Sequence, residues 1–367
     1  MKKVCHLTSV HQRDDIRIFH KECKSLQHIY EISLVVADGR GDDVVDGINI
    51  YDVGKPSARW ERMILTTKRV YKKALMLDAD IYHFHDPELI PIGLKLLKKD
   101  KKVIYDVHED VPKQLLSKPY LNKFILKIIS NAFKKYENKY AKKFTAIITV
   151  VPEITNRLRQ FNDKTVEIRN YPKLNEFAKI NVQWKDRENA MVYIGSISEI
   201  RGIYEMMQVA YKANIKLHLA GNFSTPALES DLQNHKEWQQ VIYHGVISRD
   251  NVVELLSKVK IGLLLLHPVP NHLIGLNTKI FEYLAAGLPI IASDMLHYKE
   301  IIEVNNCGFC INPFDIDAIV KKVKFLIDND QIAEEMSLNG RNAIDKYYNW
   351  QNEEVKLIEL YNYLLNS

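Results

Sequence analysis

Two series of alternating strand and helix patterns, separated by a polar stretch, constrain this 367-residue chain more than any other feature. Short apolar runs typical of buried strands recur between longer segments whose apolar residues have helical spacing. In the first series, strand patterns occur at 1–10, 32–37, 81–85, 103–107 and 146–151, and helical patterns around 58–77 and 121–143. In the second, strand patterns occur at 191–194, 215–220, 241–244, 261–266 and 289–292, and helical patterns near 202–212, 250–258, 278–286, 315–328, 331–346 and 350–365. This alternation predicts an α/β fold in which helices cover both faces of parallel sheets.

Residues 172–188 are polar and weakly periodic, and we interpret them as a linker between two α/β domains. The chain is long enough for two domains, and its apolar content of 46% supports a core in each. We therefore predict domains at 1–171 and 189–349, with a last helix at about 350–367 that packs back on the first domain. Parallel sheets bind ligands at the carboxyl ends of their strands, so two facing sheets would form a ligand cleft.

Composition and charge exclude several classes of protein. The net charge of +5 is mild and does not indicate nucleic-acid binding, and no apolar run approaches the roughly 20 residues of a membrane span. The N-terminal residues lack the features of a signal peptide, so we expect a cytoplasmic protein. Cys307 and Cys310 have the spacing of half a zinc site, but no second pair follows, and we expect all four cysteines to be structural.

The segment from Asn277 to Asp294 predicts a helix, a glycine stop and a buried strand. Lys279 and Glu282 are three residues apart near the start of this helix, so they share one helical face. Free backbone N–H groups and the positive end of the helix dipole favour an anion there. This combination suits a ligand with phosphates and hydroxyls, such as a nucleotide-sugar. The alternative is an ion pair on a surface helix.

Four segments of the chain are informative through their order and spacing. They are Val151-Pro-Glu-Ile-Thr with Glu167-Ile-Arg-Asn170-Tyr-Pro172, Tyr193-Ile-Gly195-Ser-Ile-Ser-Glu-Ile-Arg201-Gly202, Lys279-Ile-Phe-Glu282-Tyr-Leu-Ala-Ala-Gly287-Leu-Pro289, and Cys307-Gly-Phe with Pro313-Phe-Asp315 and Trp350. Together they resemble the family 4 glycosyltransferases, whose GT-B architecture has two Rossmann-like domains facing across a cleft. The resemblance covers essentially the whole chain.

The resemblance implies an enzyme that transfers a hexosyl or N-acetylhexosaminyl group from a nucleotide-sugar to a saccharide or lipid-linked saccharide. It implies retention of anomeric configuration and no required metal or other cofactor. It also suggests a place in the assembly of O-antigen lipopolysaccharide, capsule or exopolysaccharide.

By the same resemblance, the second domain holds the donor. The candidate donor-binding residues are Gly195, Ser196, Arg201, Asn277, Thr278, Lys279 and Glu282. Arg201 and Lys279 would neutralise the diphosphate leaving group, and Glu282 would accept hydrogen bonds from the ribose. The alternatives are a solvated arginine at a turn and a glutamate on a helix surface. Two positions depart from the family: Ile274 replaces the first Glu of its signature, and Ser196 replaces a frequent Arg.

The first strand pattern leads into a dense set of hydrogen-bonding side chains from Thr8 to Arg17, where most family members have a glycine-rich loop. Candidates for holding the acceptor or the donor phosphate are His11, Arg13, Asp14 and Arg17. The alternative is a helix start capped by Asp15, with an Asp–Arg pair.

Two further strand ends carry candidate site residues. His85 and Asp86 are candidate cleft residues, and His108 resembles the family histidine that approaches the transferred sugar. With His108 we predict Arg201 and Lys279 as the catalytic residues; a buried structural role is the alternative for His108.

A metal site is the less favoured interpretation of the alternating His83 and His85, whose side chains face one way on a strand. No third ligand is evident in the sequence. Asp78-Ala-Asp80 imitates a metal-binding Asp-x-Asp but precedes a strand instead of following one. We therefore expect no metal site.

Residues 113–143 contain nine lysines and a single acidic residue, Glu137, interleaved with apolar side chains. A basic amphipathic helix suits an anionic membrane surface, where lipid-linked acceptors reside. We regard peripheral contact with the inner face of the cytoplasmic membrane as one interpretation, and a solvated helix packed on its own sheet as the other.

Two other functions remain open from the sequence. A nucleotide-sugar epimerase can share the same architecture, but it would convert the donor without an acceptor. A non-catalytic nucleotide-sugar-binding protein is favoured by the departures at Ile274 and Ser196, and it would bind without transfer.

Overall fold

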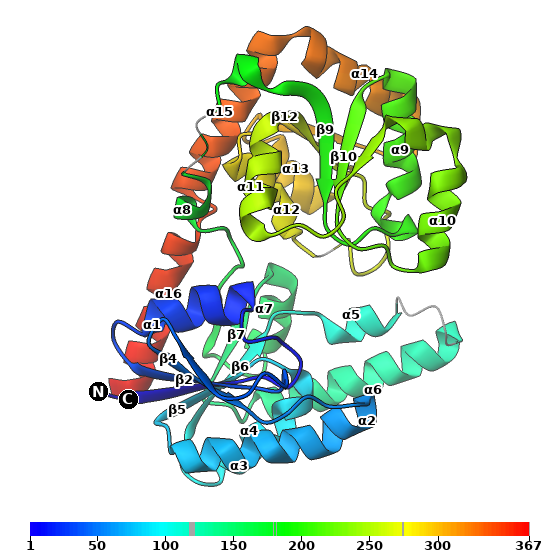
Figure 1. Ribbon diagram of the computed structural model, residues 1–367. Helices are drawn as coiled ribbons and strands as arrows, with labels where there is room; N and C mark the ends of the chain where they lie inside the picture. The colour runs from blue at the N-terminus through cyan, green and yellow to red at the C-terminus, as the bar shows by residue number, and fades with distance from the viewer. Residues whose placement is uncertain (117–121, 179, 181, 274, 367) are drawn as a thin grey trace. The chain divides into compact units, whose positions relative to one another are not determined.

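The computed structural model describes residues 1–367 except 117–121, 179, 181, 274 and 367 (Figure 1). Its contacts divide the chain into two compact units. Unit 1 consists of Met1–Asn170 and Trp350–Ser367, and unit 2 of Tyr171–Asn349.

Unit 1 contains an eight-stranded sheet of order β3-β4-β2-β1-β5-β6-β7-β8, parallel except for the antiparallel pair β3–β4. The strands are β1 (Lys3–Leu7), β2 (Glu31–Val36), β3 (Asp43–Val45), β4 (Ile48–Asp52), β5 (Ile81–Phe84), β6 (Lys102–Val107), β7 (Ala146–Thr149) and β8 (Thr165–Glu167). The helices are η1 (Ile16–Cys23), α1 (Lys24–Leu26), α2 (Arg59–Glu61), η2 (Arg62–Thr66), α3 (Thr67–Leu77), η3 (Pro87–Leu89), α4 (Ile90–Leu97), α5 (Val111–Leu116), α6 (Lys123–Ala141), α7 (Pro152–Arg159) and α16 (Trp350–Asn366).

The core of unit 1 joins the start of the chain to residues more than 300 positions later. Trp350, Leu357 and Tyr361 of α16 are buried with apolar residues of the sheet and of η1, and the Trp350 indole donates to Ser25 Oγ at 2.9 Å. The predicted helix at 350–365 is thus present and completes this core.

Unit 2 contains a six-stranded sheet of order β11-β10-β9-β12-β13-β14, in which each pair of neighbours is parallel. The strands are β9 (Glu188–Ile194), β10 (Lys216–Ala220), β11 (Val241–Tyr243), β12 (Val259–Leu264), β13 (Ile290–Ser293) and β14 (Gly308–Ile311). The helices are α8 (Leu174–Phe177), η4 (Trp184–Asp186), η5 (Glu199–Arg201), α9 (Ile203–Ala213), α10 (Pro226–Asn234), η6 (Lys236–Gln240), α11 (Arg249–Lys258), α12 (Thr278–Ala285), α13 (Leu296–Ile302), α14 (Ile316–Asp328) and α15 (Asp330–Lys346).

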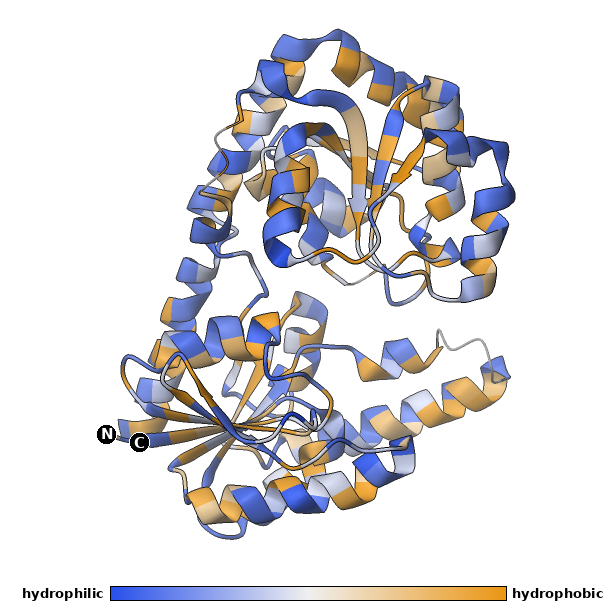
Figure 2. Ribbon diagram, in the orientation of Figure 1, coloured by the Kyte–Doolittle hydropathy of each residue, from blue (hydrophilic) through white to orange (hydrophobic). Residues whose placement is uncertain are grey.

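The prediction of two Rossmann-like parallel sheets is confirmed. Apolar colour is concentrated in the strands of each sheet, while the helices alternate between apolar and polar residues (Figure 2). Such a pattern follows from strands buried on both faces and helices buried on one.

The segment 172–188, expected to be a linker, carries α8 and η4 and contributes to the core of unit 2 through Phe177 and Trp184. Four strands were not expected: the pair β3–β4, β8, and β14, which begins inside the Cys307-Gly-Phe-Cys310 motif. Within the described part of the chain, no helix combines the length and apolar character needed to cross a membrane.

Candidate functional site

The loop from β9 to α9 is shaped by two glycines. Gly195 has φ 135°, and a Cβ there would lie 2.7 Å from Lys279 Nζ, so the absence of a side chain lets that lysine cross the loop. Gly202, with φ 77°, ends η5, and a Cβ there would collide with the Leu265 carbonyl oxygen at 2.0 Å. Both conformations favour glycine. The loop therefore brings the end of β9, Ser196 and Arg201 against the start of α12.

Two cations meet at this loop. The charge of Arg201 contributes to lowering the pKa of Lys279 to about 8, behind the larger effect of burial. Lys279 Nζ lies 5.8 Å from the centre of the Tyr193 ring. Burial raises the pKa of Tyr193, and the charge of Arg201 and its hydrogen bond to Tyr193 oppose that rise. Among the residues that the structure describes, neither cation forms an ion pair with a carboxylate. Two adjacent positive charges without acidic partners form an electrostatic site for an anion.

The beginning of α12 lies beside these cations. Asn277 caps the helix by accepting a hydrogen bond from the Lys279 backbone N–H at 3.1 Å, and Thr278 is the first helical residue. Glu282 does not pair with Lys279: its Oε1 accepts from Arg249 at 2.6 Å. Arg249 is also held by Glu176 at 2.7 Å. The alternative of a Lys279–Glu282 surface ion pair is therefore wrong, and the half-buried Glu282 is positioned by Arg249.

Three residues near Arg201 were missed from the sequence. The Tyr298 hydroxyl is buried and has no hydrogen-bond partner among the described residues, and His272 Nδ1 lies 2.9 Å from the His267 carbonyl oxygen. The pKa of His272 is lowered by burial and by the charge of Arg201. Only the sheet order brings the loop after β12 next to the loop after β9, so local sequence spacing carried no signal for these residues.

In unit 1, two of the predicted residues meet at the carboxyl ends of β1 and β6. His11 Nε2 lies 3.2 Å from His108 Nε2, and the two rings are 5.0 Å apart. His11 Nδ1 is 3.0 Å from Asp15, whereas His108 Nδ1 is 3.4 Å from Asp106. Both histidines are partly exposed, and a ligand hydroxyl that replaces the contact between the two Nε2 atoms would hydrogen-bond both rings.

The buried carboxylate of Asp86 holds the loop after β1 by hydrogen bonds. Its Oδ2 accepts from Thr8 Oγ1 at 2.8 Å and from the Ser9 backbone N–H at 2.6 Å. Asp86 is only 2% exposed and His85 only 1%. The prediction that His85 and Asp86 line a cleft is therefore corrected: both support the loops from beneath, because buried carboxylates and imidazoles bind neighbouring polar groups instead of solvent.

The arginines of the β1 loop are structural. Arg13 donates to both carboxylate oxygens of Asp38, at 2.7 and 2.8 Å, and is 7% exposed. Arg17 makes two 2.9 Å bonds to Asp106 in the same way. Asp14 is exposed and lies 3.3 Å from Arg40. The prediction that Arg13 and Arg17 hold a ligand is corrected, because each guanidinium is buried and is already bound to both oxygens of a carboxylate.

Asp15 also caps η1, as the alternative for this loop predicted: it accepts from the backbone N–H groups of Arg17 and Ile18 at 2.8 and 2.9 Å.

The statement that His83 and His85 lack further ligands is corrected as well. His6 of β1 and Glu22 of η1 join them, and the potential ligand atoms of the four lie within 4.8 Å of one another. A second group that could bind a metal consists of His85, Asp106 and His108.

A pocket of about 600 Å³ lies between α5, α6 and α7 of unit 1. Lys113, Lys134 and Arg157 contribute positive charge to its lining, and Asp110 and Glu153 contribute carboxylates. Part of the lysine-rich segment 113–143 thus lines a pocket that contains both positive and negative side chains.

Ile274, where the family signature has a Glu, lies outside the described residues. Cys5, Cys23 and Cys307 are buried free thiols, and Cys310 is half-buried.

Comparisons with known proteins agree with this division of the chain. Residues 23–170 match the model of Glycosyltransferase Family 4, and residues 175–343 match that of glycosyl transferases group 1. The chain is 23% identical over 182 residues to the capsular polysaccharide biosynthesis glycosyltransferase CapM of Staphylococcus aureus, covering 48% of this chain and 46% of CapM. It spans about half the length of the curated relatives it matches.

Solved structures share the whole fold. Sucrose-phosphate synthase from Thermosynechococcus elongatus superimposes with a TM-score of 0.77 at 14% identity, covering 100% of both chains. Anabaena Alr3699/HepE in complex with UDP and glucose has a TM-score of 0.70 at 12% identity, covering 99% of this chain and 100% of that one.

Proposed function

Since the chain belongs to the GT-B glycosyltransferases of family 4 and group 1, we propose that it transfers a sugar from a nucleotide-sugar to a saccharide or lipid-linked saccharide acceptor. The observation that carries this proposal is the pair Arg201 and Lys279, two adjacent cations left without carboxylate partners in the described part of unit 2. A diphosphate supplies two negative charges of the kind such a pair attracts.

The proposed donor contacts follow from the geometry of unit 2. The diphosphate lies against Gly195 and Ser196, and it is neutralised by Arg201 and by Lys279, whose side chain occupies the space that the absent side chain of Gly195 leaves. Glu282, held in place by Arg249, accepts hydrogen bonds from the ribose hydroxyls. HepE, which shares the fold, was solved with UDP and glucose, and this supports a nucleotide donor for the present chain.

The proposed chemistry needs positive charge at the leaving group more than it needs a strong base. As the bond between the anomeric carbon and the diphosphate breaks, negative charge grows on the leaving oxygen, and Arg201 and Lys279 stabilise it. In front-side displacement, the departing diphosphate also helps to take the acceptor proton, which gives retention of configuration. No metal at the diphosphate is required, because the two side chains supply the charge.

The proposed acceptor site lies in unit 1. The His11–His108 pair can hydrogen-bond sugar hydroxyls, and the pocket between α5, α6 and α7, in which Arg157 is already paired with Glu137 and Lys113 lies near Asp110, offers further hydrogen-bonding groups to a saccharide. The capsular role of the relative CapM favours assembly of a surface polysaccharide.

The same function accounts for an exposed apolar face on α6. Phe124, Ile125, Ile128 and Ile129 are 71, 46, 53 and 40% exposed, while the buried positions Leu126, Ser130, Glu137 and Ala141 face the fold. Lysines 123 and 127 are exposed beside this apolar face. We propose that α6 binds the anionic surface of the membrane that carries a lipid-linked acceptor.

The donor proposal is tested by a thermal-shift screen of nucleotide-sugars and free nucleoside diphosphates, since a ligand that binds the native state raises Tm. The wild-type protein should respond to at least one of them, and Arg201→Ala should not. An unchanged shift in the variant would overturn the assignment. The responding donor is then incubated with and without saccharide acceptors. Turnover of donor alone to an isomer would indicate an epimerase, and binding without transfer would indicate a non-catalytic protein.

The membrane proposal is tested by co-sedimentation with vesicles of phosphatidylcholine, with and without phosphatidylglycerol. The protein should sediment only with the anionic vesicles, and Phe124→Asp should release it. Met76→Asp is the matched control, since Met76 is an equally exposed apolar residue of unit 1, at 78%, outside α6. Equal sedimentation of the two variants would contradict this role of α6.

A further inference from the structure

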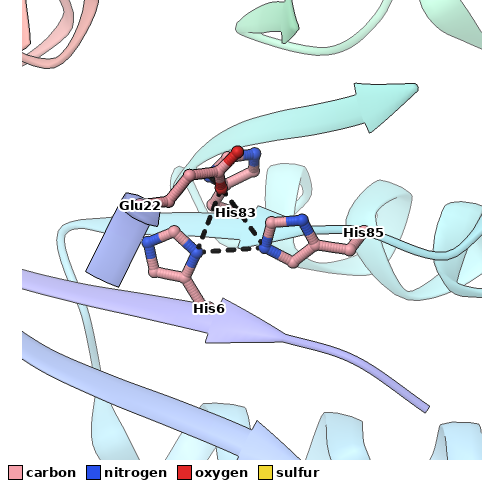
Figure 3. A group of neighbouring side chains, drawn as sticks. All are labelled: His6, Glu22, His83 and His85. Carbon is pink, nitrogen blue, oxygen red and sulfur yellow. Dashed lines mark hydrogen bonds and ion pairs between the residues drawn. The ribbon is translucent and has the colours of Figure 1, made fainter. Parts of the chain in front are cut away.

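Four side chains from three distant parts of the sequence meet inside unit 1. Figure 3 shows His6 of β1, His83 of β5, His85 just after β5 and Glu22 of η1 pointing toward a common centre. His6, Glu22 and His83 are 0% exposed, and His85 is 1% exposed. Parallel pairing of β1 with β5 places His6 directly beside His83, so the sheet itself brings the histidines together.

The distances between these groups are those of ligands around one ion. Glu22 Oε2 lies 3.9 Å from His6 Nδ1, 3.6 Å from His83 Nδ1 and 3.8 Å from His85 Nε2. His6 Nδ1 and His85 Nε2 are 3.0 Å apart. Ligand atoms at the corners of a tetrahedron around zinc are about 3.4 Å apart, given metal–ligand bonds of about 2.0–2.2 Å. Shifts of less than about 1 Å would complete that geometry.

Hydrogen bonding within the protein leaves this cluster incomplete. Among the described residues, neither oxygen of Glu22 accepts a hydrogen bond, although Glu22 Oε2 is the atom that faces all three imidazoles. A buried polar group without a partner costs free energy, so native proteins rarely keep several together. Glu22 does face Arg17, whose Nε is 3.1 Å from Oε1, but Arg17 is already committed to both oxygens of Asp106.

Metal binding would also change how the acidic groups are held. One guanidinium, Arg17, faces both buried carboxylates, Glu22 and Asp106. A divalent cation in the cluster would bind Glu22 and leave Arg17 to Asp106.

The surroundings resemble the supporting contacts of a metal site. His85 Nδ1 lies 3.0 Å from Asp106 Oδ2, so a proton on Nδ1 is held by a carboxylate and Nε2 is left to face the cluster. Carboxylate–histidine pairs of this kind orient metal ligands and raise their basicity. η1 is a π-helix, in which residues five apart lie one above the other, and this places Glu22 on the same inward face as Arg17.

We propose that His6, Glu22, His83 and His85 bind a single divalent transition-metal ion, with zinc expected. Three imidazoles and one carboxylate are a nitrogen-rich set that suits zinc over magnesium or calcium. Four protein ligands in a fully buried position describe a closed site, which is structural and not catalytic. The ion would join β1, η1 and β5. On binding, His83 Nδ1 exchanges its 2.9 Å contact with the Tyr361 hydroxyl for the metal.

The full-length protein, produced without a histidine tag in zinc-supplemented medium, should contain roughly one zinc per chain by mass spectrometry. After removal of metal with a chelator, titration with Co²⁺ alone should produce the intense visible bands of tetrahedral cobalt, and added Zn²⁺ should raise Tm. Wild-type protein that stays folded but shows no zinc, no cobalt bands and no rise in Tm would overturn the proposal. This part of the test uses no variant, so it does not depend on a substituted protein folding.

Variants then locate the ion. Glu22→Gln and His83→Gln preserve size but remove or weaken a ligand, and each should reduce the metal content about tenfold in protein shown to be folded by circular dichroism. His218→Gln is the matched control, because His218 is also buried beside a carboxylate, Glu188, and a second histidine, His244, but in unit 2. Retention of metal in Glu22→Gln and His83→Gln would refute the site. Loss of metal in His108→Gln alone would place the ion in the His85–Asp106–His108 group and would overturn the proposal.

Discussion

Each unit has a basic loop directly after its first strand, but the two loops treat their charge in opposite ways. After β1, the buried guanidinium of Arg13 is bound by both oxygens of Asp38. After β9, Arg201 lies next to Lys279, and neither has a carboxylate partner among the residues described. The two regions show that the presence of an arginine at a strand end says little about ligand binding. What separates a structural arginine from a ligand-binding one is whether the fold has already neutralised it.

The largest effect is expected from the neutralised arginine. Arg13→Ala leaves the buried Asp38 carboxylate without its main partner, and it should lower the free energy of unfolding by about 3 kcal/mol. Urea denaturation measures this change. Transfer activity per folded molecule should stay at the wild-type level. An Arg13→Ala variant that is stable but inactive would show that Arg13 binds a substrate.

Removing Arg201 or Lys279 should instead lower activity and leave stability unchanged. Arg201→Ala or Lys279→Ala should reduce kcat/KM more than tenfold, which corresponds to about 1.4 kcal/mol of transition-state stabilisation. The Tm of each variant should not fall, because removing one of two repelling cations relieves strain. Lys299→Ala, which removes a half-exposed lysine of unit 2 paired with Asp294, serves as the control and should keep full activity. Near-normal rates in both variants would remove the proposed donor site.

The pH dependence of donor binding sharpens the comparison further. The pKa of Lys279 is lowered to about 8 by burial and by Arg201, so this lysine loses its proton between pH 7 and 9. If only the charged form binds the diphosphate, the Kd for a nucleotide-sugar should rise up to about tenfold across this range. Calorimetric titration at both pH values measures the change, and Lys279→Met should abolish it.

A rise in pH should stabilise the donor-free protein although it weakens donor binding. A folded-state pKa below the ordinary 10.5 means that burying charged Lys279 destabilises the protein at pH below 8. This penalty is relieved as the pH rises from 8 toward 10.5. Donor-free protein should therefore gain stability over an interval in which it loses affinity.

The smallest effect is expected from Asp14, the exposed member of the β1 loop. Its contact with Arg40 is solvent-exposed and screened, so Asp14→Ala should change the free energy of unfolding by less than about 0.5 kcal/mol. It should leave transfer activity unchanged. A large loss of activity at constant stability would show that Asp14 contacts a substrate, contrary to the comparison of the two loops.

Sequence reasoning worked best where the signal was local. Helix periodicity predicted α9, α11, α12, α14, α15 and α16 to within a residue or two at each end, because each has an apolar face along one stretch of chain. The short strands β3, β4, β8 and β14 were not predicted, since three to five residues give too few alternations to distinguish from a loop. The π-helix η1 also has no periodic signature of its own in the sequence.

Contacts between segments that are distant in the sequence limited how much of the sites could be predicted. His83 and His85 were recognised as a pair because two residues along a strand face the same way. His6 and Glu22 were not connected to them, because strand order decides that β1 lies next to β5, and no local pattern encodes that order. Neutralisation of Arg13 by Asp38, 25 positions away, was hidden for the same reason.

The position of α16 bears on how the protein is made. Trp350, Leu357 and Tyr361 fill the core of unit 1, yet a ribosome delivers them only after all of unit 2 has been translated. The nascent unit 1 must therefore wait with part of its apolar interior uncovered, while unit 2 has every residue it needs to fold first. Unit 1 therefore cannot complete its core until unit 2 has been synthesised, although its own synthesis begins first.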